Sequence, residues 1–302
     1  MQQHLHVFVK VVEQKSFSRA AEQLHMTQPA VSQYIKLLEQ NYGQKLLDRT
    51  NKYVYLTKAG EVVYFHAKEI LGLYAKMHRL VDDLSNHPRG QLSIGASFTF
   101  GEYVLPHIIA EMHKIFPEIK PSIIIGNTKE IIELVERHQL DIGIIEGDVK
   151  KGQAKIEQFA EDQMFIVASR NHPLSEGGLV KSHELMAERW IVREPGSGTR
   201  EATEKLFRDF SMSPSEIMEF GSTQVIKESV ESGLGISLLS KFAIRKEVAM
   251  GLLKVIEVEG APYKRNFSIA LGTSFQTKAV QIFINLLKDM KSTGDSIHHA
   301  EK

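Results

Sequence analysis

Apolar residues recur at helical spacing in three short segments at the start of the chain. The first segment covers residues 4–14. The second is expected to begin at Ser18, whose side chain suits a helix N-cap, and to stop at residues 25–26. The third is expected to begin at Thr27 and to end at Gly43. The predicted buried faces consist of Leu5, Phe8, Val9 and Val12, of Ala20, Ala21 and Leu24, and of Val31, Ile35 and Leu38.

A β-leaning stretch and a long helical pattern follow. Residues 53–55 (Tyr-Val-Tyr) lie behind a polar tip at residues 48–52, which predicts a short hairpin or wing. From Thr57 to about residue 86 no Pro interrupts the pattern, which predicts one long helix. Its apolar stripe needs a partner, either a second subunit or the chain's own first helix. The heptad rows are Val63, Ile70, Met77 and Leu84; His66, Leu73 and Leu80; and Ala67, Tyr74 and Val81.

Residues 87–90 (His-Pro-Arg-Gly) end the helical pattern and predict a hinge between two domains. Beyond the hinge, short apolar runs alternate with helical patterns, which is typical of βα units and predicts largely parallel sheets. The expected strands are residues 92–95, 122–125, 141–145, 165–169, 190–192, 217–220, 236–239, 253–258 and 266–271. The expected helices are residues 101–115, 129–138, 199–210, 223–232, 242–250 and 276–290, and the polar last dozen residues are expected to be disordered.

Composition narrows the class of protein. A chain of 302 residues with 42% apolar and 25% charged residues has room for about two globular domains. No cysteine is present, which excludes disulfides, thiolate zinc sites and thiol redox switches. Neither a signal peptide nor a membrane span is recognisable, so we expect a soluble, cytoplasmic protein without membrane partners.

The charge of the chain is unevenly divided although it sums to zero. Residues 1–60 contain eight Lys and Arg against four Asp and Glu, a formal charge of +4, and the remaining residues contain 29 against 33, a charge of −4. A small basic domain attracts the phosphate backbone of DNA, so the N-terminal segment is the candidate for nucleic-acid binding.

Residues 18–39 fit a helix, a tight turn and a second helix that reads the major groove of DNA. Polar side chains that can bond base edges repeat along one face of the second helix, opposite its apolar face. The two basic residues of the wing would hold phosphates. The alternative is an ordinary helical hairpin with a solvated polar face. The candidate DNA-binding residues are Ser18, Arg19, Thr27, Gln28, Pro29, Ser32, Gln33, Lys36, Arg49 and Lys52.

Four turns rich in Gly, Ser and Thr follow predicted strands and open predicted helices, at residues 95–99, 126–128, 195–200 and 221–224. Glycines let the backbone approach a ligand, and free N–H groups at helix starts attract negative charge. Since the carboxyl ends of strands in α/β sheets form the ligand crevice, the turns together predict a site for a small anion. The alternative is that the hydroxyls only cap helices.

The run from Ser16 to Gly60 resembles the N-terminal signature of LysR-type transcription regulators, and the rest of the chain continues the resemblance. The resemblance implies an N-terminal all-α winged helix-turn-helix and an α/β effector domain like periplasmic binding proteins. It implies tetramers, as dimers of dimers, that bend promoter DNA. The wing departs from the pattern, since residues 53–55 stand where many members carry Arg or other polar residues. The expected domains are residues 1–58, a dimerising linker helix at 59–87 and an effector domain at 88–302, with subdomain I at 91–161 and 265–302 and subdomain II at 162–264.

The segment 193–200 resembles branches of the family that control sulphur assimilation or carbon fixation. The resemblance favours a sulphur oxyanion as effector, with a phosphorylated or carboxylated metabolite as the alternative. Arg200 either contributes charge to this site or pairs with Glu204. The candidate effector-binding residues are Ser97, Phe98, Thr99, Thr128, Glu146, Gly196, Ser197, Thr199, Arg200, Thr223 and Gln224.

The expected partners are promoter DNA, a small anionic effector, further copies of the chain and RNA polymerase, as for an activator. No cofactor and no metal is expected. An enzyme is disfavoured because the chain lacks G-x-x-x-x-G-K-[ST], G-x-G-x-x-G after the first strand of the α/β half, and H-E-x-x-H. A DNA-binding protein that needs no ligand is the alternative class. The residues expected to pair subunits are Val63, Ile70, Leu73, Tyr74, Met77, Leu80, Val81 and Leu84.

Overall fold

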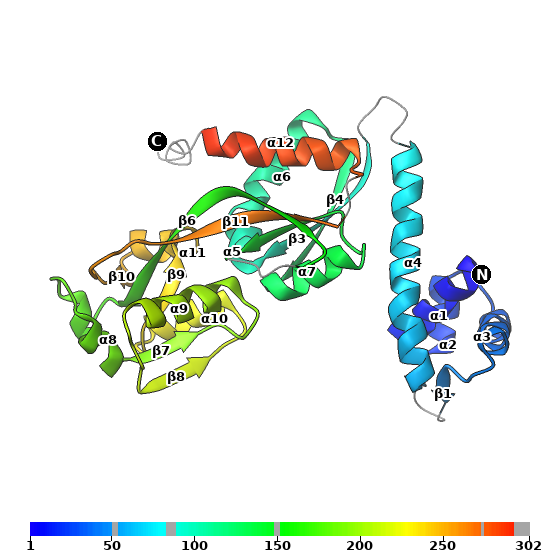
Figure 1. Cartoon of the computed structure of the whole chain (residues 1–302), viewed down its shortest axis with the longest axis horizontal. Helices are drawn as coiled ribbons and strands as arrows, with labels where there is room; N and C mark the ends of the chain where they lie inside the picture. The colour runs from blue at the N-terminus through cyan, green and yellow to red at the C-terminus, as the bar shows by residue number, and fades with distance from the viewer. Residues whose placement is uncertain (50–53, 83–88, 148–151, 273–274, 293–302) are drawn as a thin grey trace. The chain divides into compact units, whose positions relative to one another are not determined.

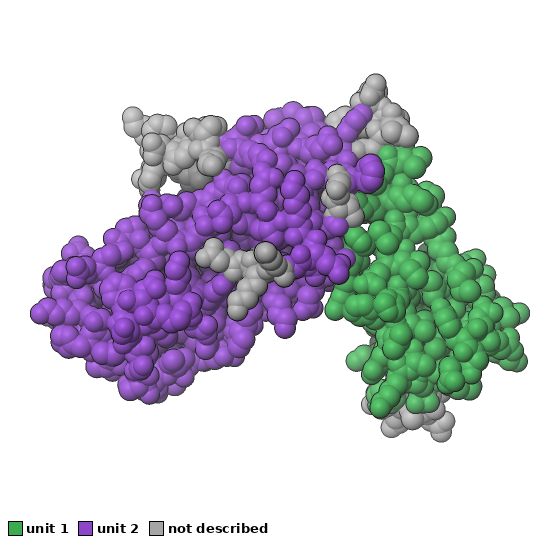
Figure 2. All heavy atoms as spheres, viewed as in Figure 1, with its two compact units in different colours: residues 1–82, 137–139 green, residues 83–136, 140–302 purple. Residues whose placement is uncertain are grey.

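The computed structural model describes residues 1–49, 54–82, 89–147, 152–272 and 275–292. They divide into two compact units, residues 1–82 with 137–139 and residues 83–136 with 140–302 (Figure 2). Within the described residues, no helix is long and apolar enough to cross a membrane.

The first unit has helical and hairpin elements at the predicted places (Figure 1). Thr27 and Gly43 bound the third helix as predicted: the Thr27 hydroxyl accepts from the N–H of Ala30, and Gly43 has a φ of 63°. The prediction that Ser18 caps the second helix was wrong. The cap is Ser16, whose hydroxyl accepts from the N–H of Arg19, and the helix begins at Phe17, two residues earlier than a cap at Ser18 requires. The elements are α1 (Gln2–Gln14), α2 (Phe17–Gln23), α3 (Gln28–Tyr42), β1 (Leu47–Arg49), β2 (Val54–Leu56) and α4 (Lys58–Asp82).

Thr57 fixes the start of the long helix α4 against the hairpin. Its hydroxyl donates to the carbonyl of Lys45 at 2.7 Å and accepts from the N–H of Gly60 at 3.0 Å. A Cβ at Gly60 would lie 2.0 Å from the carbonyl oxygen of Leu46, so only glycine fits there. The predicted hairpin is confirmed by the antiparallel pairing of β1 and β2. The predicted helical residues 83–86 lie outside the described residues.

The second unit alternates strands and helices, as predicted. The predicted helix at 101–115 is instead two helices that meet at Val104, with Pro106 in the first turn of the second. The elements are β3 (Gly90–Ser97), α5 (Phe98–Tyr103), α6 (Leu105–Ile115), β4 (Ile119–Gly126), α7 (Thr128–Glu136), β5 (Ile142–Glu146), β6 (Lys155–Ser169), a 3-10 turn (Pro173–Ser175), α8 (Ser182–Ala187), β7 (Arg189–Val192), α9 (Gly198–Asp209), β8 (Glu216–Glu219), α10 (Thr223–Glu231), β9 (Ser237–Ser240), α11 (Lys241–Ala249), β10 (Leu253–Val255), β11 (Tyr263–Leu271) and α12 (Lys278–Ser292).

The main sheet has seven strands, in the order β10-β6-β11-β5-β3-β4, with β9 also paired to β6. The expectation of largely parallel sheets was wrong for this sheet. β3 is parallel to β4 and β5, but β11 is antiparallel to β5 and β6, and β6 is antiparallel to β9 and β10. β6 is also longer than the predicted residues 165–169. The prediction missed its first half because that half is mostly polar and carries no apolar run.

Helices cover both faces of the strands β3, β4 and β5, with α6 and α12 on one face and α7 on the other (Figure 1). A separate pair of hydrophobic clusters lies in the other half of the unit, one of them around the fully buried Trp190. The strand β6 contributes Phe159 to the first half and Met164 to the second. The two long strands β6 and β11 therefore connect the two halves, and they carry the buried ion pair of Arg265 and Asp162 described below.

Candidate functional site

The second helix of the helix-turn-helix, α3, presents a polar face to solvent. Val31, Ile35 and Leu38 are fully buried in the core of the first unit, and the opposite face is open. The side-chain amide of Gln28 donates to the hydroxyl of Ser32 at 2.9 Å, so the two groups lie side by side on that face. Of the candidate DNA-binding residues, Ser32 is half-buried and these are exposed: Ser18, Arg19, Thr27, Gln28, Pro29, Gln33 and Lys36.

The wing is described only in part. The Arg49 side chain and Lys52 lie outside the described residues. Val54 is half-buried against the core, while Tyr55 is exposed. The departure from the family pattern at residues 53–55 is therefore explained at Val54, which packs inward.

The helix α4 has two apolar faces. Ala67 is buried, and Val63 and Leu71 pack beside it on the chain's own core, as the alternative interpretation of the stripe predicted. Five of the residues expected to pair subunits are between 38% and 60% exposed. Leu80 is half-buried and Leu84 lies outside the described residues. The exposed residues are Ile70, Leu73, Tyr74, Met77 and Val81.

A buried arginine organises the second unit. Arg265 of β11 is 5% exposed and donates to Asp162 of β6 at 2.7 Å, and it forms an ion pair of 2.7 Å with Glu146 at the end of β5. Its two terminal nitrogens also donate to the hydroxyls of Thr199 and Thr99, each at 3.0 Å. One guanidinium thus contacts strands β5 and β6 and the first turns of α5 and α9.

The two threonine hydroxyls bound to Arg265 are oriented by it. A guanidinium has no acceptor, so Thr99 and Thr199 must accept from it, and each keeps its own O–H free to donate. Among the described residues, neither hydroxyl has an acceptor for that proton. Since both are within 3.0 Å of the same guanidinium, two donors converge from α5 and α9.

A second buried arginine repeats this arrangement at the end of β7. Arg193 is 1% exposed, donates to the hydroxyl of Thr223 at 3.1 Å and binds the adjacent Glu194 with two hydrogen bonds of 2.7 and 2.8 Å. Its guanidinium lies 4.2 Å from the ring centre of Phe98. Asn127 donates to Glu194 at 3.3 Å. Thr223 is therefore a third hydroxyl that accepts from a buried arginine and retains its own proton as a donor.

Other predicted effector residues already form hydrogen bonds within the protein. Ser97 donates to the carboxylate of Glu146 at 2.7 Å, and Thr128 donates to the carbonyl of Glu146 at 3.0 Å. The Ser197 hydroxyl caps α9 by accepting from the N–H of Thr199. The carbonyl of Gly196, which has a φ of 92°, accepts from the N–H of Lys129.

Two predicted effector residues pair with neighbours on their own helices. The Arg200 guanidinium donates to Glu204 at 2.7 Å and also contacts Glu219, as the salt-bridge alternative predicted. The Gln224 amide donates to Glu228 at 2.8 Å. Arg200 also donates to the main-chain carbonyl of Arg193 at 3.1 Å, so it contacts the second arginine centre through the backbone, whereas the Gln224 side chain contacts neither centre.

Burial and charge shift the pKa values at both centres. Burial raises the pKa of Asp162, and the Glu146 charge adds to the shift, while Arg265 opposes it. Burial acts to lower the pKa of Arg265, but Glu146 and Asp162 raise it above its ordinary value. Burial acts to raise the pKa of Glu194, yet the hydrogen bonds from Arg193 bring it below its usual range. Arg265 is therefore held charged.

The residues that organise the site, Arg193, Arg265 and Asp162, were absent from the predicted set. Lys227 was also missed; it pairs with Glu247 at 2.6 Å and lies over the ring of Tyr103. No clear signal in the sequence indicated Arg265, which lies between Lys264 and Asn266 in the polar first half of β11, just before the predicted strand at 266–271.

Two family models match the chain, "Bacterial regulatory helix-turn-helix protein, lysR family" over residues 2–61 and "LysR substrate binding domain" over residues 85–292. The chain is 37% identical over 285 residues to the HTH-type transcriptional regulator CysL of Bacillus subtilis (strain 168), an alignment that covers 94% of this chain and 95% of that protein.

Two solved structures are similar to the chain. The Synechocystis PCC6803 CcmR regulatory domain, in complex with 2-PG, is 25% identical with a TM-score of 0.62, and the match covers 68% of this chain and 99% of that one. Full-length CbnR in complex with its target DNA is 20% identical with a TM-score of 0.72, covering 96% and 99% of the two chains, which shows the shared fold. The chain therefore belongs to the LysR family of transcriptional regulators, with an N-terminal helix-turn-helix domain and an effector-binding domain.

Proposed function

We propose that a small anion bound in the second unit controls how this regulator binds and bends promoter DNA. The polar face of α3 enters the major groove, with Gln28, Ser32 and Lys36 at base edges and Arg49 at a phosphate. The exposure of that face supports the assignment. A regulator of promoter DNA acts beside the chromosome, so we place it in the cytoplasm.

The observation that carries the effector site is the orientation of three threonine hydroxyls by two buried arginines. Thr99, Thr199 and Thr223 accept from Arg265 or Arg193, and each keeps an O–H proton. Hydroxyl donors held in fixed positions suit the oxygens of a small oxyanion. Because the arginines already order these hydroxyls, little conformational entropy is lost when the anion binds. The ring of Phe98, stacked on Arg193, would form an apolar wall of the site.

The effector belongs to one of two classes of anion. A sulphur oxyanion is the first candidate, from the resemblance of residues 193–200. A phosphorylated or carboxylated metabolite is the second, and the 2-PG complex of the related CcmR regulatory domain supports it. Anions of both classes carry several oxygens that can accept from the same O–H donors, so the three threonine hydroxyls can bind an anion of either class.

The proposed mechanism is linkage between ligand and DNA. Thr99 belongs to the proposed subdomain I, and Thr199 and Thr223 belong to the proposed subdomain II, so an anion held by all three favours one arrangement of the subdomains. We further propose that α4 pairs two subunits, that two such dimers form a tetramer, and that the assembly contacts RNA polymerase. The exposed apolar side chains of α4 support the pairing.

Binding of anions to the full-length chain tests the effector class. Calorimetric titration with sulphite, sulphate, thiosulphate, phosphate and 2-phosphoglycolate is expected to give saturable binding for one class, and the Thr199→Val variant is expected to lose it. The Thr199→Ser variant, which restores an O–H, is expected to regain most of the affinity. Footprints on DNA that do not change with any of these anions would instead support a DNA-binding protein that needs no ligand.

A further inference from the structure

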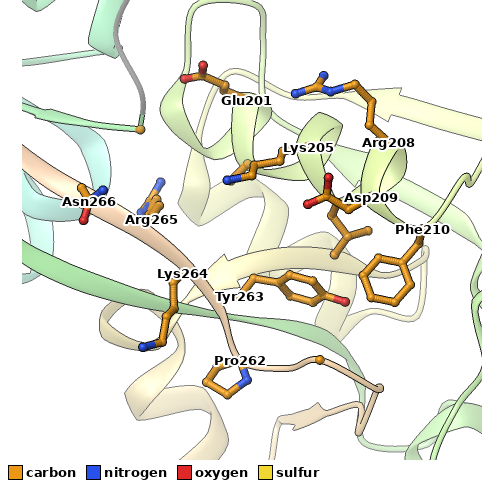
Figure 3. Close-up of a pocket in the computed structure, with 14 residues that line it drawn as sticks. Glu201, Lys205, Arg208, Asp209, Phe210, Pro262, Tyr263, Lys264, Arg265 and Asn266 are labelled. Atoms are coloured by element: carbon orange, nitrogen blue, oxygen red, sulfur yellow. The ribbon is translucent and has the colours of Figure 1, made fainter.

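A pocket of about 470 Å³ opens between α9 and β11 (Figure 3). This volume falls in the range of roughly 300–1,000 Å³ that small-molecule sites occupy. Leu206, Phe210 and Tyr263 give it an apolar part, in which the rings of Phe210 and Tyr263 meet edge to face at 5.8 Å. The threonine hydroxyls proposed to hold the effector do not line this pocket.

The polar part of the pocket contains two cations without an ion-pair partner among the described residues. Lys205 extends from α9 on the side of Arg265 and Asn266 (Figure 3), and among the described residues it has no ion-pair partner. Lys264, on the rim, is paired with Glu161 at 3.0 Å, and the Arg265 charge is met by two carboxylates. Arg208 of α9 also lines the pocket and has no ion-pair partner among the described residues, so Lys205 and Arg208 are the cations that a ligand can neutralise.

The acidic residues of the lining fix the orientation of a ligand. Asp209 lies beside Phe210 and Tyr263, one turn of α9 beyond Lys205 (Figure 3). An anionic group is repelled by Asp209 and attracted to Lys205. Glu201 also lines the pocket, on the turn of α9 that precedes Lys205, and it excludes a second anionic group there.

Tyr263 offers a hydrogen bond inside the pocket. Its hydroxyl oxygen is buried and has no hydrogen-bond partner among the described residues. Burial, and next the charge of Asp209, raise the pKa of Tyr263 to about 12, so the phenol stays a neutral donor at physiological pH. A buried donor without a partner is costly, and a ligand oxygen would satisfy it.

We propose that this pocket is a second binding site, for one small organic anion whose negative group faces Lys205 and whose apolar body lies against Leu206 and the Phe210–Tyr263 ring pair. The site goes beyond the proposed effector site and is linked to it. α9 carries both Lys205 and Thr199, and β11 carries both Tyr263 and Arg265. A ligand that holds α9 against β11 therefore biases the position of the Thr199 donor.

The only tryptophan of the chain provides a local probe. Trp190 is buried and its ring lies 4.8 Å from that of Phe207, a residue of α9. Phenyl phosphate, which joins a phosphate to one ring, is titrated into the full-length protein and followed by Trp190 fluorescence and by calorimetry. We expect saturable binding with a Kd of about 1 mM or below.

The decisive variants change the exposed Lys205 and the half-buried Tyr263. Lys205→Gln is expected to weaken binding of phenyl phosphate about tenfold, and Tyr263→Phe about fivefold. Lys246→Gln, at an exposed lysine of α11 outside the pocket, is the matched control and is expected to bind like the wild type. Equal affinity of the wild type and Lys205→Gln, or no saturable binding below about 10 mM, would overturn the second site.

The effector site is tested separately with the same probe. Thr223→Val, which removes a proposed effector donor, is expected to bind phenyl phosphate normally. Loss of binding in Thr223→Val together with normal binding in Lys205→Gln would mean that the probe occupies the effector site, and the second site would then be wrong while the proposed function stands. If the wild type binds phenyl phosphate normally but its DNA binding responds to no anion, the second site would stand and the proposed function would be wrong.

Discussion

Arg265 and Asp162 form an ion pair of 2.7 Å in which the two side chains are 3% and 0% exposed. Glu146 approaches the same guanidinium at 2.7 Å and is also buried. Inside the protein, one positive charge therefore meets two negative ones, on three strands of the main sheet. Each of these charges depends on the others, because ions removed from water are tolerated only when paired and hydrogen-bonded.

Replacing Arg265 is expected to destabilise the protein strongly. Arg265→Met leaves Glu146 and Asp162 buried without their cation, at a cost of about 3–5 kcal/mol in the free energy of unfolding. The control is Lys264→Met on the same strand, which breaks an exposed pair with Glu161 and is expected to cost less than about 1 kcal/mol. Urea denaturation measures both. Similar losses in the two variants would contradict the assignment of Arg265 as the organising cation.

The raised pKa of Asp162 predicts a pH dependence of stability with a definite sign. The folded state keeps a proton on Asp162 at pH values where the unfolded chain, with an ordinary value of 3.8, has lost it. The contribution of this group to stability is therefore complete below 3.8 and declines as the pH rises through the folded pKa. Urea unfolding of the wild type relative to Asp162→Asn, from about pH 4 upward, is expected to show this decline. A relative stability that rises with pH would contradict it.

The α3 face predicts separate effects on sequence preference and on general affinity. Gln28→Ala and Ser32→Ala are expected to relax the preference for particular bases, at about 1–3 kcal/mol of discrimination for each lost contact. Arg49→Ala is expected to weaken binding to all DNA sequences alike and to reduce the salt dependence by about one ion. Selection from random duplexes with the full-length protein measures preference, and Gln40→Ala, on the last turns of α3, is the control. A changed preference in Arg49→Ala would contradict its role at a phosphate.

The exposed apolar face of α4 predicts an interface between subunits. Leu73→Glu and Met77→Glu place charge among the exposed side chains, so the assembly is expected to dissociate, with a sedimentation coefficient that falls towards that of the monomer. Glu61→Lys, near the start of α4, changes charge away from these residues and is the control. An unchanged assembly in both glutamate variants would show that subunits meet elsewhere.

Local signals predicted the first unit well. The caps Thr27 and Gly43 and the apolar spacing of α3 act over a few residues, so the sequence specifies that helix almost by itself. The cap of α2 was misplaced by two residues, because Ser16 and Ser18 are both suitable and only the turn after α1 decides between them. The packing of Val63 and Leu71 on the core depended on tertiary contacts.

The sheet and the site depend on contacts between distant residues. β6 and β11 pair over most of their length, but the polar first half of β6 resembles an exposed segment when its partner is unknown. The hydroxyl-rich turns were visible locally, whereas the arginines that orient them come from other strands. Arg265 lies 66 residues from Thr199 and 166 residues from Thr99, so no local spacing connects them.

The central claim is that an anion held by the O–H groups of Thr99, Thr199 and Thr223 changes how the protein bends DNA. Each of these hydroxyls already accepts from an arginine, so valine removes the donor to the anion and also an arginine contact. Serine at the same position keeps both. Comparing Val and Ser variants therefore separates loss of the hydroxyl from loss of side-chain bulk.

The most direct measurement is energy transfer between dyes at the two ends of an operator duplex bound by the full-length protein, with each anion added in turn. The wild type and Thr223→Ser are expected to change the bend with one class of anion, and Thr223→Val is expected to bind the duplex with a bend that no longer responds. A full response in Thr223→Val and in Thr199→Val would contradict the account.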